Sequence, residues 1–410
     1  MIRYLAPLFI ALGLAACGGS NSSAPPVNVV PPPPPPPPAS FGTGPAACLS
    51  GKADGYDCAA VDLEKHLTLA DLGGGFGNDI WGWTDMNGNE YALMGLTNGT
   101  VFVNISDPKN PIIVGNLPTQ TVASTWRDIK VFGDHAYIVA DNAGAHGMQI
   151  FSLARLRNST TNQTFTADAL YSQFANAHNI AINEDAAFAY AVGTNTCDEG
   201  LHMINISDPL VPRFAGCHEG GDTHDTQCVN YQGPDTDYTG REICFSSNSD
   251  TVGIADVTDK STPVQVKQFT YPNLSFVHQA WLDETHTYLI VNDETDEIDR
   301  GQNTSTIVVD VSDLDNPRYL YTHAGTTGAT DHNLYIVGNK IFQANYHAGL
   351  QILEYSDLAT DTLVETASFD TFPADDSSGF DGAWSVYPFF ASGTIIVSDT
   401  ERGLFVFRPQ

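Results

Sequence analysis

Residues 100–117 read TVFVNISDPKNPIIVGNL: a β-branched run, a Ser-Asp-Pro turn and a second apolar run. The same layout returns at residues 201–217, 252–269, 306–323 and 350–369. A weaker copy begins at Met148. The copies lie about 50 residues apart, or at twice that distance, a period typical of propeller blades. The repeat therefore predicts an all-β propeller, although a length of 410 residues alone would suggest two or three domains.

Two further strand candidates precede each copy, which makes four strands per unit and fits a propeller blade. Counting the units predicts seven blades; six or eight stay open if a degenerate unit is miscounted. The last unit, residues 382–410, has only three strand candidates. We expect its outer strand to come from the N-terminal side, where HLTLADL (66–72) precedes the first blade, because this closes the ring and removes an exposed sheet edge.

The N-terminal residues indicate export and lipidation. Arg3, an apolar run and the sequence LAAC ending at Cys17 resemble a bacterial signal peptide with a lipobox; an ordinary signal peptide with an incidental cysteine is the alternative. The apolar run is too short to remain as a membrane span. We expect a lipoprotein signal peptide over 1–16, a Pro-rich linker over 17–45 that carries lipid on Cys17, and the propeller over 46–410.

The linker contains an unbroken proline run at 31–38. Polyproline is extended, solvated and stiff, so we expect a disordered stalk that holds the propeller away from the membrane. Gly18 follows the cysteine where an aspartate would favour the inner membrane. The predicted location is therefore the outer membrane, facing the periplasm or the cell surface, with the membrane bound through the lipid on Cys17.

The net charge is −31, from 48 acidic and 17 basic residues. This excess argues against a nucleic-acid partner and against adhesion to a bare anionic membrane, and it favours solubility and cation binding. The chain has 7 cysteines, and an even number remains once Cys17 is set aside. In an oxidising compartment these favour three disulfides. The strand pattern favours the pairs Cys48–Cys58, Cys197–Cys217 and Cys228–Cys244. A Cys-ligated metal is less favoured because the chain has no CxxC motif.

Several inner-strand motifs occur together in this chain. They are NDIWGWTD (78–85), RDIKVF (127–132), HNIAIN (178–183), THDTQCV (223–229), HQAWL (278–282), DHNLY (331–335) and GAWSVYPFF (382–390). The ISDP-type repeats resemble the LVIVD repeat, and the motifs together resemble the choice-of-anchor B family of bacterial surface proteins over about residues 61–410. The resemblance implies a propeller-like domain and surface attachment, here through Cys17, and implies no activity or site residues.

Aligning the starts of the innermost strands brings one ionisable residue from every blade into equivalent positions. They are Asp79, Arg127, His178, His224, His278, His332 and Asp381. We expect them to form a ring at the mouth of the central channel. Neutral imidazoles with a carboxylate suit a divalent transition metal, although only three or four ring members can reach one ion. The alternative is that the channel holds water and the histidines bond to backbone groups of neighbouring blades.

Loops between second and third strands should reach the same face as the ring. They contain His146, Asp198, Glu199 and His347, and the segment DETDEID (293–299). That segment contributes Asp293, Glu294, Asp296, Glu297 and Asp299. Dense oxygen ligands suit Ca²⁺, but the spacing is not that of an EF-hand. A solvated acidic loop, partly neutralised by Arg127 and Arg300, is the alternative.

The chain has no GxSxG, HExxH, P-loop or dinucleotide motif. The tryptophans are expected to pack between blades, with a carbohydrate-stacking platform as the alternative. We expect a binding or interaction module that uses the upper face of the propeller to bind an unidentified protein or small molecule. The alternative is a metal-dependent hydrolase or oxidoreductase that uses the ring. A cofactor, if present, is a divalent cation, either Ca²⁺ or a transition metal.

Overall fold

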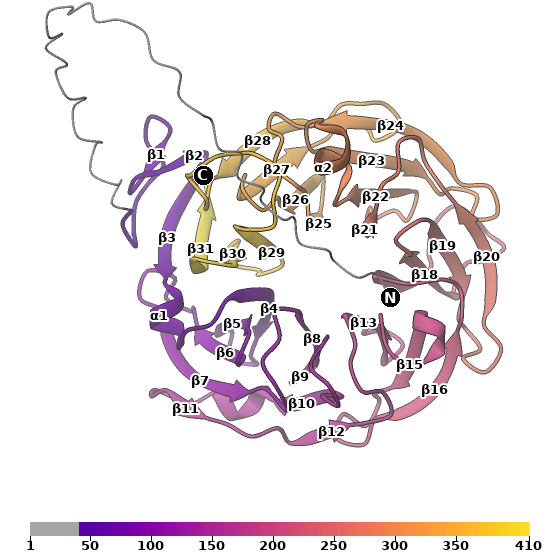
Figure 1. Ribbon diagram of the computed structural model, residues 1–410, viewed down its shortest axis with the longest axis horizontal. Helices are drawn as coiled ribbons and strands as arrows, with labels where there is room; N and C mark the ends of the chain where they lie inside the picture. Colours follow the sequence, from indigo (N-terminus) through magenta and orange to yellow (C-terminus); the bar gives the residue numbers. More distant parts are fainter. Residues whose placement is uncertain (1–40) are drawn as a thin grey trace, which may run out of the picture. The chain divides into compact units, whose positions relative to one another are not determined.

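The computed structural model describes residues 41–410, in which seven β-sheets are arranged radially around one axis (Figure 1). Ser40–Gln410 forms one compact unit. The predicted all-β, seven-bladed propeller is thus confirmed. The expected signal peptide, lipidated Cys17 and proline run at 31–38 lie outside the described residues.

Blades one to six each contain four antiparallel strands. Blade one contains β4 (Gly77–Thr84), β5 (Glu90–Leu96), β6 (Gly99–Asn104) and β7 (Ile112–Pro118). Blade two contains β8 (Arg127–Phe132), β9 (His135–Ala140), β10 (Met148–Ser152) and β12 (Ala169–Tyr171). Blade three contains β13 (Asn179–Asn183), β14 (Phe188–Val192), β15 (Leu201–Asn205) and β16 (Arg213–His218). Blade four contains β17 (Asp225–Asn230), β18 (Glu242–Ser247), β19 (Val252–Asp256) and β20 (Val264–Phe269). Blade five contains β21 (Val277–Leu282), β22 (Tyr288–Asp293), β23 (Ser305–Asp310) and β24 (Arg318–Ala324). Blade six contains β25 (Asn333–Val337), β26 (Lys340–Ala344), β27 (Leu350–Glu354) and β28 (Val364–Phe369).

Blade seven takes its outer strand from the N-terminal side. It contains β29 (Ala383–Tyr387), β30 (Ile395–Asp399) and β31 (Gly403–Pro409), and β3 (Val61–Leu67) pairs with β31. The predicted closure is confirmed, but the strand lies earlier than residues 66–72. Helix α1 (Leu69–Leu72) follows it, because the Thr68 hydroxyl accepts from the Asp71 N–H and the Asp71 carboxylate accepts from the Thr68 N–H.

Three short strands extend two of the sheets. β1 (Lys52–Ala53) and β2 (Tyr56–Ala59) form a hairpin that adds to the outer edge of blade six through β28. β11 (Gln163–Thr164) adds in parallel to β7 of blade one. These additions cover outer edges that would otherwise present unpaired backbone groups.

Side-chain turns explain the Ser-Asp signature of the repeat. After β6, Asn104 Oδ1 accepts from the Ser106 N–H at 3.0 Å, and Asp107 Oδ1 accepts from the Lys109 N–H at 3.2 Å. Equivalent turns follow the third strands of blades four and five. Because these oxygens satisfy backbone donors locally, the chain can reverse between the third and fourth strands of a blade.

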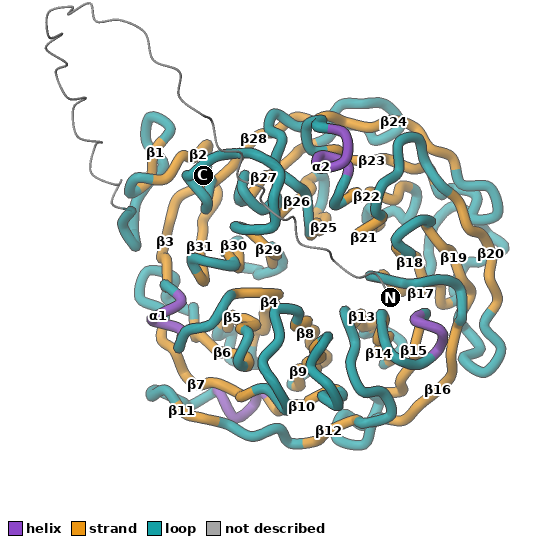
Figure 2. Tube along the Cα trace, viewed as in Figure 1, coloured by secondary structure: helices purple, strands orange, loops and turns teal. Residues whose placement is uncertain are grey.

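In the part of the chain that the structure describes, helices are few and lie in connections between strands (Figure 2). They are α1, α2 (Asp296–Arg300), and the 3₁₀ turns η1 (Leu153–Leu156) and η2 (Cys197–Glu199). Among residues 41–410, none has the length and hydropathy that crossing a bilayer requires. The core lies between blades, as where Phe102 of blade one stacks on Phe151 of blade two with ring centroids 4.7 Å apart.

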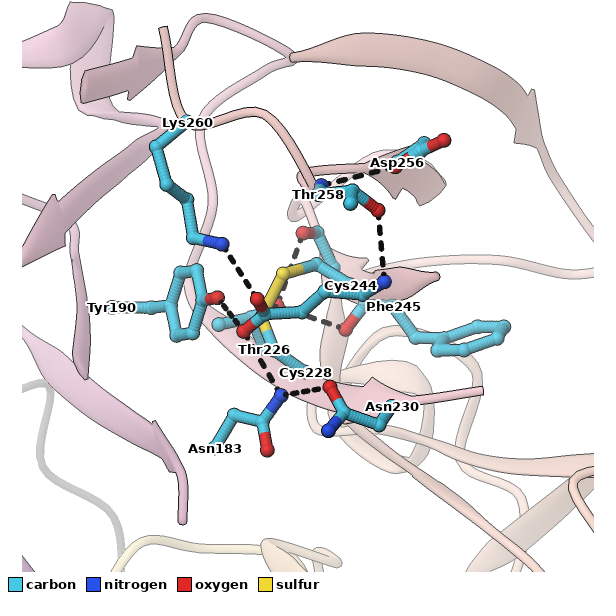
Figure 3. The surroundings of a disulfide bond; sticks show 12 residues. Asn183, Tyr190, Thr226, Cys228, Asn230, Cys244, Phe245, Asp256, Thr258 and Lys260 are labelled. Atoms are coloured by element: carbon cyan, nitrogen blue, oxygen red, sulfur yellow. Dashed lines mark hydrogen bonds and ion pairs between the residues drawn. A yellow bond between two sulfur atoms is a disulfide. The ribbon is translucent and has the colours of Figure 1, made fainter. Parts of the chain in front are cut away.

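Disulfides join the three predicted pairs, Cys48–Cys58, Cys197–Cys217 and Cys228–Cys244. Cys228 and Cys244 are register partners on β17 and β18. Beside this bond, Tyr190, Asn183 and Lys260 point toward one another (Figure 3). They meet at the buried Glu242 carboxylate, which lies 2.5 Å from Lys260 Nζ and 2.9 Å from Asn183 Nδ2 and also accepts from the Tyr190 hydroxyl. This network joins blades three and four.

Candidate functional site

The inner strands begin at one end of the channel, and the predicted ring residues lie around that mouth. All of them except Asp381 line one pocket of about 10 Å³, which has room for about one water molecule: Asp79, Arg127, His178, His224, His278 and His332. Asp381 is exposed and lies outside this pocket. Trp384 lines the pocket in blade seven instead.

Two blades depart from the sequence alignment. In blade seven the Trp384 carbonyl accepts from His332 Nδ1, as the His332 carbonyl accepts from His278 Nδ1. Trp384 therefore holds the ring position, three residues beyond Asp381. In blade one the alignment is shifted by one residue.

Asp79 belongs to the layer just below the mouth. Its Oδ2 accepts from the Ile129 N–H at 3.0 Å, as Asp128 Oδ2 accepts from the Ile180 N–H at 2.6 Å. Asp79 is thus equivalent to Asp128, which follows Arg127 in the chain. Asp79 therefore lies one residue beyond the ring position of its blade.

The four ring histidines form a continuous arc across consecutive blades. Ring centroids are 4.3 Å apart for His178 and His224, 4.4 Å for His224 and His278, and 4.2 Å for His278 and His332. Trp384 continues the arc 4.5 Å from His332. The repeat thus brings together side chains that are far apart in the sequence.

Each histidine uses Nδ1 to bond to a neighbouring group. His224 Nδ1 donates to the His278 carbonyl at 3.2 Å, and His278 Nδ1 donates to the His332 carbonyl at 2.9 Å. His332 Nδ1 donates to the Trp384 carbonyl at 2.5 Å, and His178 Nδ1 lies 3.1 Å from Asp141 Oδ2. The bonds of His224, His278 and His332 are the backbone contacts between blades that the sequence offered as an alternative, whereas His178 bonds to a side chain. Since a carbonyl only accepts, Nδ1 carries the proton in these neutral rings and Nε2 keeps its lone pair.

Two of these Nε2 atoms converge with a carboxylate from the loop after β22. Glu294 Oε1 lies 3.9 Å from His278 Nε2 and 3.8 Å from His332 Nε2, and the three ligand atoms all lie within 4.8 Å of one another. The Tyr346 hydroxyl donates to the same carboxylate at 2.9 Å. Bonds of about 2.0–2.2 Å to a tetrahedral ion separate ligand atoms by about 3.4 Å, so both histidine Nε2 atoms would have to move closer to Glu294 Oε1 by about half an ångström to bind one ion.

Burial shifts the pKa values of His278, His332 and Glu294. It lowers the pKa of His332 to about 3 and holds the pKa of His278 well below its usual range, an effect that neighbouring histidines reinforce. Both rings are therefore neutral at pH 7, the form that binds metals. Burial raises the pKa of Glu294 to about 7, against the opposing hydrogen bond from Tyr346. Because metal ligands must be deprotonated, a bound cation would release the remaining proton of Glu294.

Arg127 completes one side of the mouth. Its side chain is buried, Nε donates to the Leu96 carbonyl at 3.1 Å and Nη1 lies 3.2 Å from His146 Nε2. Burial lowers the pKa of Arg127 to about 10. Nη2 has no hydrogen-bond partner among the described residues. Arg127 is therefore bonded to His146 and not to the acidic loop.

Below the mouth, a lysine whose side chain is 12% exposed holds the inward carboxylates of two blades. Lys130 Nζ lies 2.5 Å from Asp128 Oδ1, 3.4 Å from Asp79 Oδ2 and 4.7 Å from the centre of the Trp81 ring. Burial alone would lower the pKa of Lys130, but the two carboxylates raise it well above its usual value. Burial raises the pKa of Asp225 to about 6, opposed by the Lys130 charge.

The far end of the channel opens into a cavity of about 340 Å³. Aromatic walls come from Trp81, Trp281, Tyr387 and Phe389, and Lys130 lies at its inner end. The other tryptophans lie elsewhere: Trp83 packs on Tyr91, Trp126 lies near His178 and Trp384 lies beside His332.

The carboxylates of residues 293–299 lie in several different environments. Glu294 reaches the mouth, whereas Asp293 accepts from the Tyr271 hydroxyl and the Ser275 and Phe276 N–H groups. Asp296 and Glu297 are buried and Asp299 is exposed. The Arg300 side chain donates to Ser275 Oγ and the Leu274 carbonyl, so its hydrogen bonds do not go to these carboxylates.

Three other loop residues were candidates from the sequence: Asp198, Glu199 and His347. Asp198 and Glu199 are exposed, and Glu199 lines a shallow pocket together with His178 and His224. His347 stacks on Phe372 and its Nδ1 lies 3.1 Å from Asp375, away from the mouth.

Two residues of this region were not identified from the sequence. Lys130 is one of only 17 basic residues in a chain of charge −31, and its place in an inner strand was the available signal. Asp331 is fully buried and directly precedes His332. The sequence alone does not distinguish it from an aspartate on the surface.

Comparisons with known proteins agree with this architecture. A family model described as the LVIVD repeat matches residues 87–119, which contain β5, β6 and β7. No curated protein matches the chain.

Three solved structures are similar to this chain. The β-propeller domain of Myceliophteria thermophila Cps50 (Swd1) has 10% identity and a TM-score of 0.52, covering 82% of this chain and 97% of its own. A Lactobacillus plantarum protein has 12% identity and a TM-score of 0.51, covering 78% and 87%. The Pseudomonas aeruginosa periplasmic gluconolactonase PpgL has 11% identity and a TM-score of 0.49, covering 71% and 87%. At these identities the first two show the fold alone. The chain is a seven-bladed β-propeller that carries an LVIVD repeat in its first blade.

Proposed function

We propose that this protein is a surface or periplasm-facing binding module that holds a divalent transition-metal ion at its channel mouth. The observation that carries the proposal is the convergence of His278 Nε2, His332 Nε2 and a Glu294 oxygen within 4.8 Å of one another. Two imidazoles and one carboxylate are a ligand set suited to Zn²⁺, Fe²⁺ and related ions. The Nδ1 hydrogen bonds fix the orientation of both rings, as partners of metal ligands do in known sites.

The ion would supply the attachment point for a partner. Three protein ligands leave coordination positions free, so a donor group of a partner can complete the shell. Arg127 lines the same pocket and has a free Nη2 among the described residues. A carboxylate of a small molecule or of a protein side chain matches both the ion and this guanidinium. The mouth pocket has room for about one water molecule, so such a carboxylate would enter it with a single oxygen atom.

We also propose that the protein is exported and anchored to the outer membrane. The lipobox at Cys17 and the proline run support an outer-membrane lipoprotein on a stalk, and the inner-strand motifs support membership of the choice-of-anchor B family. The net charge of −31 argues against nucleic acid as the partner.

A metal-dependent hydrolase or oxidoreductase is the second candidate. The observation in its favour is His224, whose ring lies 4.4 Å from that of His278 and whose Nδ1 is held by a carbonyl. Its Nε2 is available as a general base beside an open metal position. Metal-dependent turnover of ester or phosphoester substrates that is lost in His224→Ala, with metal still bound, would favour the enzyme over the binding module.

Calorimetric titration of chelator-treated protein with Zn²⁺ tests the metal site. We expect one ion per chain, and we expect Glu294→Gln to weaken binding by more than the roughly 10–100-fold that loss of an outer partner costs. The double variant His278→Ala/His332→Ala should not bind. His323→Ala is the matched control, because His323 pairs with Asp361 on the surface. Equal affinity of the double variant and this control would contradict the proposal.

A further inference from the structure

The cavity at the far end of the channel has two chemically different sides. Its volume is about 340 Å³, near the lower end of the range for small-molecule sites, and no residue lines both this cavity and the mouth pocket. Blades one, five and seven form an aromatic side, with Trp81, Trp281, Tyr387 and Phe389. Blades two to four form the opposite side, where Lys130, Glu184, Asp225 and Gln227 lie among small and aliphatic residues.

The aromatic side is held in place by a ring behind it. Tyr335 of blade six is buried, and its ring centroid lies 4.8 Å from that of Trp281 and 5.7 Å from that of Trp81. The Tyr387 ring lies 5.1 Å from that of Trp81 and 5.2 Å from that of Phe389. Both tryptophans are nevertheless only half-buried, and Phe389 is 37% exposed. The aromatic side is therefore preformed and leaves apolar surface open to a ligand.

The polar side offers both donors and acceptors. Lys130 Nζ bonds to two carboxylates, which leaves one of its three N–H groups unused by them. Gln227 Oε1 accepts from a backbone N–H of blade five at 2.8 Å, whereas its Nε2 has no hydrogen bond within residues 41–410. Asp225 Oδ1 accepts from the N–H of the next residue at 2.6 Å, and its Oδ2 is a further acceptor. The exposed Glu184 adds acceptors at the rim.

This combination favours a neutral ligand with hydroxyl groups. A cation would suit aromatic rings and carboxylates, but Lys130 Nζ already lies 4.7 Å from the centre of the Trp81 ring. An anion would suit Lys130, but Asp225 and Glu184 would repel it in a chain of net charge −31. Hydroxyl groups both donate and accept, so they can bond to an ammonium, a carboxylate and an amide alike.

We propose that the far-end cavity binds one pyranose ring of a carbohydrate. A pyranose has a face of C–H groups and a rim of hydroxyl groups. The C–H face would pack on Trp81, Trp281 and Phe389, while the hydroxyl groups would bond to Lys130 and Asp225. The proposal assigns the carbohydrate-stacking alternative to the two tryptophans of the cavity. It does not depend on the metal site at the mouth.

Saturation-transfer NMR on the purified full chain tests the proposal. The probes are methyl β-D-glucoside, methyl β-D-galactoside, methyl α-D-mannoside and methyl N-acetyl-β-D-glucosaminide. We expect saturable binding of at least one of them, with a dissociation constant on the order of 1 mM and the strongest transfer to ring C–H protons. Trp281→Ala should weaken this binding by about 10-fold. Asp225→Asn, which leaves the aromatic side intact, should weaken it by a similar factor.

Two control variants and two control ligands make the outcome decisive. Trp126→Ala removes a tryptophan at the opposite end of the channel and should keep the sugar affinity. His278→Ala/His332→Ala should also keep it while losing Zn²⁺, so failure of one site is separable from failure of the other. Sorbitol, which has hydroxyl groups but no ring, and the cation choline should bind more weakly than the best glycoside.

Three results would overturn the proposal. The first is the absence of saturable binding by all the glycosides. The second is tighter binding of sorbitol or choline than of any glycoside. The third is wild-type sugar affinity in both Trp281→Ala and Asp225→Asn.

Discussion

Glu242→Gln is expected to destabilise the propeller much more than the loss of an equally close pair on its surface. The Glu242 and Lys260 side chains are only 7% and 9% exposed, and Oε2 lies 2.5 Å from Nζ. Glutamine keeps an oxygen for Tyr190 and Asn183 but removes the charge that compensates the buried ammonium. Breaking a buried pair from one side costs about 3–5 kcal/mol, and the retained hydrogen bonds favour the lower end, about 3 kcal/mol.

The matched control is Asp57→Asn. Lys52 Nζ lies 2.7 Å from Asp57, but these side chains are 57% and 61% exposed. Water already solvates both charges, so we expect a loss of less than about 0.5 kcal/mol. The two substitutions are chemically alike and differ mainly in burial.

Urea denaturation followed by tryptophan fluorescence measures both free energies of unfolding. The double variant Glu242→Gln/Lys260→Met should recover most of the loss, because it leaves no uncompensated charge. A loss for Glu242→Gln within about 1 kcal/mol of that for Asp57→Asn would refute the claim that the buried charge pair holds blades three and four together.

Further predictions concern a disulfide, a buried histidine and the closing strand. Replacing Cys197 and Cys217 by Ala should lower the free energy of unfolding by about 3 kcal/mol, the loop-closure value for a separation of 20 residues, measured by denaturation against the wild type. Burial lowers the pKa of His202 to about 4, so on acidification the unfolded chain binds a proton before the folded chain does. The free energy of unfolding therefore falls between about pH 6.5 and 4, by at most about 1.4 kcal/mol per pH unit. His202→Gln should show a shallower pH dependence of the free energy of unfolding. Leu63→Ala in β3 should cost about 2–4 kcal/mol, because Leu63 is 1% exposed; a cost no larger than that of Leu49→Ala at an exposed site would argue against closure through β3.

Much of the architecture is readable from the sequence because propeller blades repeat both turns and strands. The Asx turns after the third strands of blades one and three to six require the same side-chain types, so the pattern around Asp107 could be counted along the chain. The count also aligned His178, His224, His278 and His332, which the structure brings into one arc.

The rest could not be predicted because it depends on local geometry that the repeat does not encode. The alignment was shifted by one residue at Asp79 and by three at Asp381, because the ring position depends on which residue meets the neighbouring blade, and the His332 Nδ1 hydrogen bond goes to Trp384. The closing strand was displaced because Thr68 and Asp71 form a helix cap. Which carboxylate of the segment 293–299 reaches the mouth depends on how the chain folds after β22, and composition alone treats its acids as equivalent.

Anomalous diffraction at the zinc absorption edge, from crystals grown with Zn²⁺, is the most direct test of the proposed centre. We predict one strong peak per chain, about 2.0–2.2 Å from His278 Nε2, His332 Nε2 and a carboxylate oxygen of Glu294. A map without a peak at the mouth, or with its only peaks at surface carboxylates, would contradict the assignment of the channel mouth as a metal site.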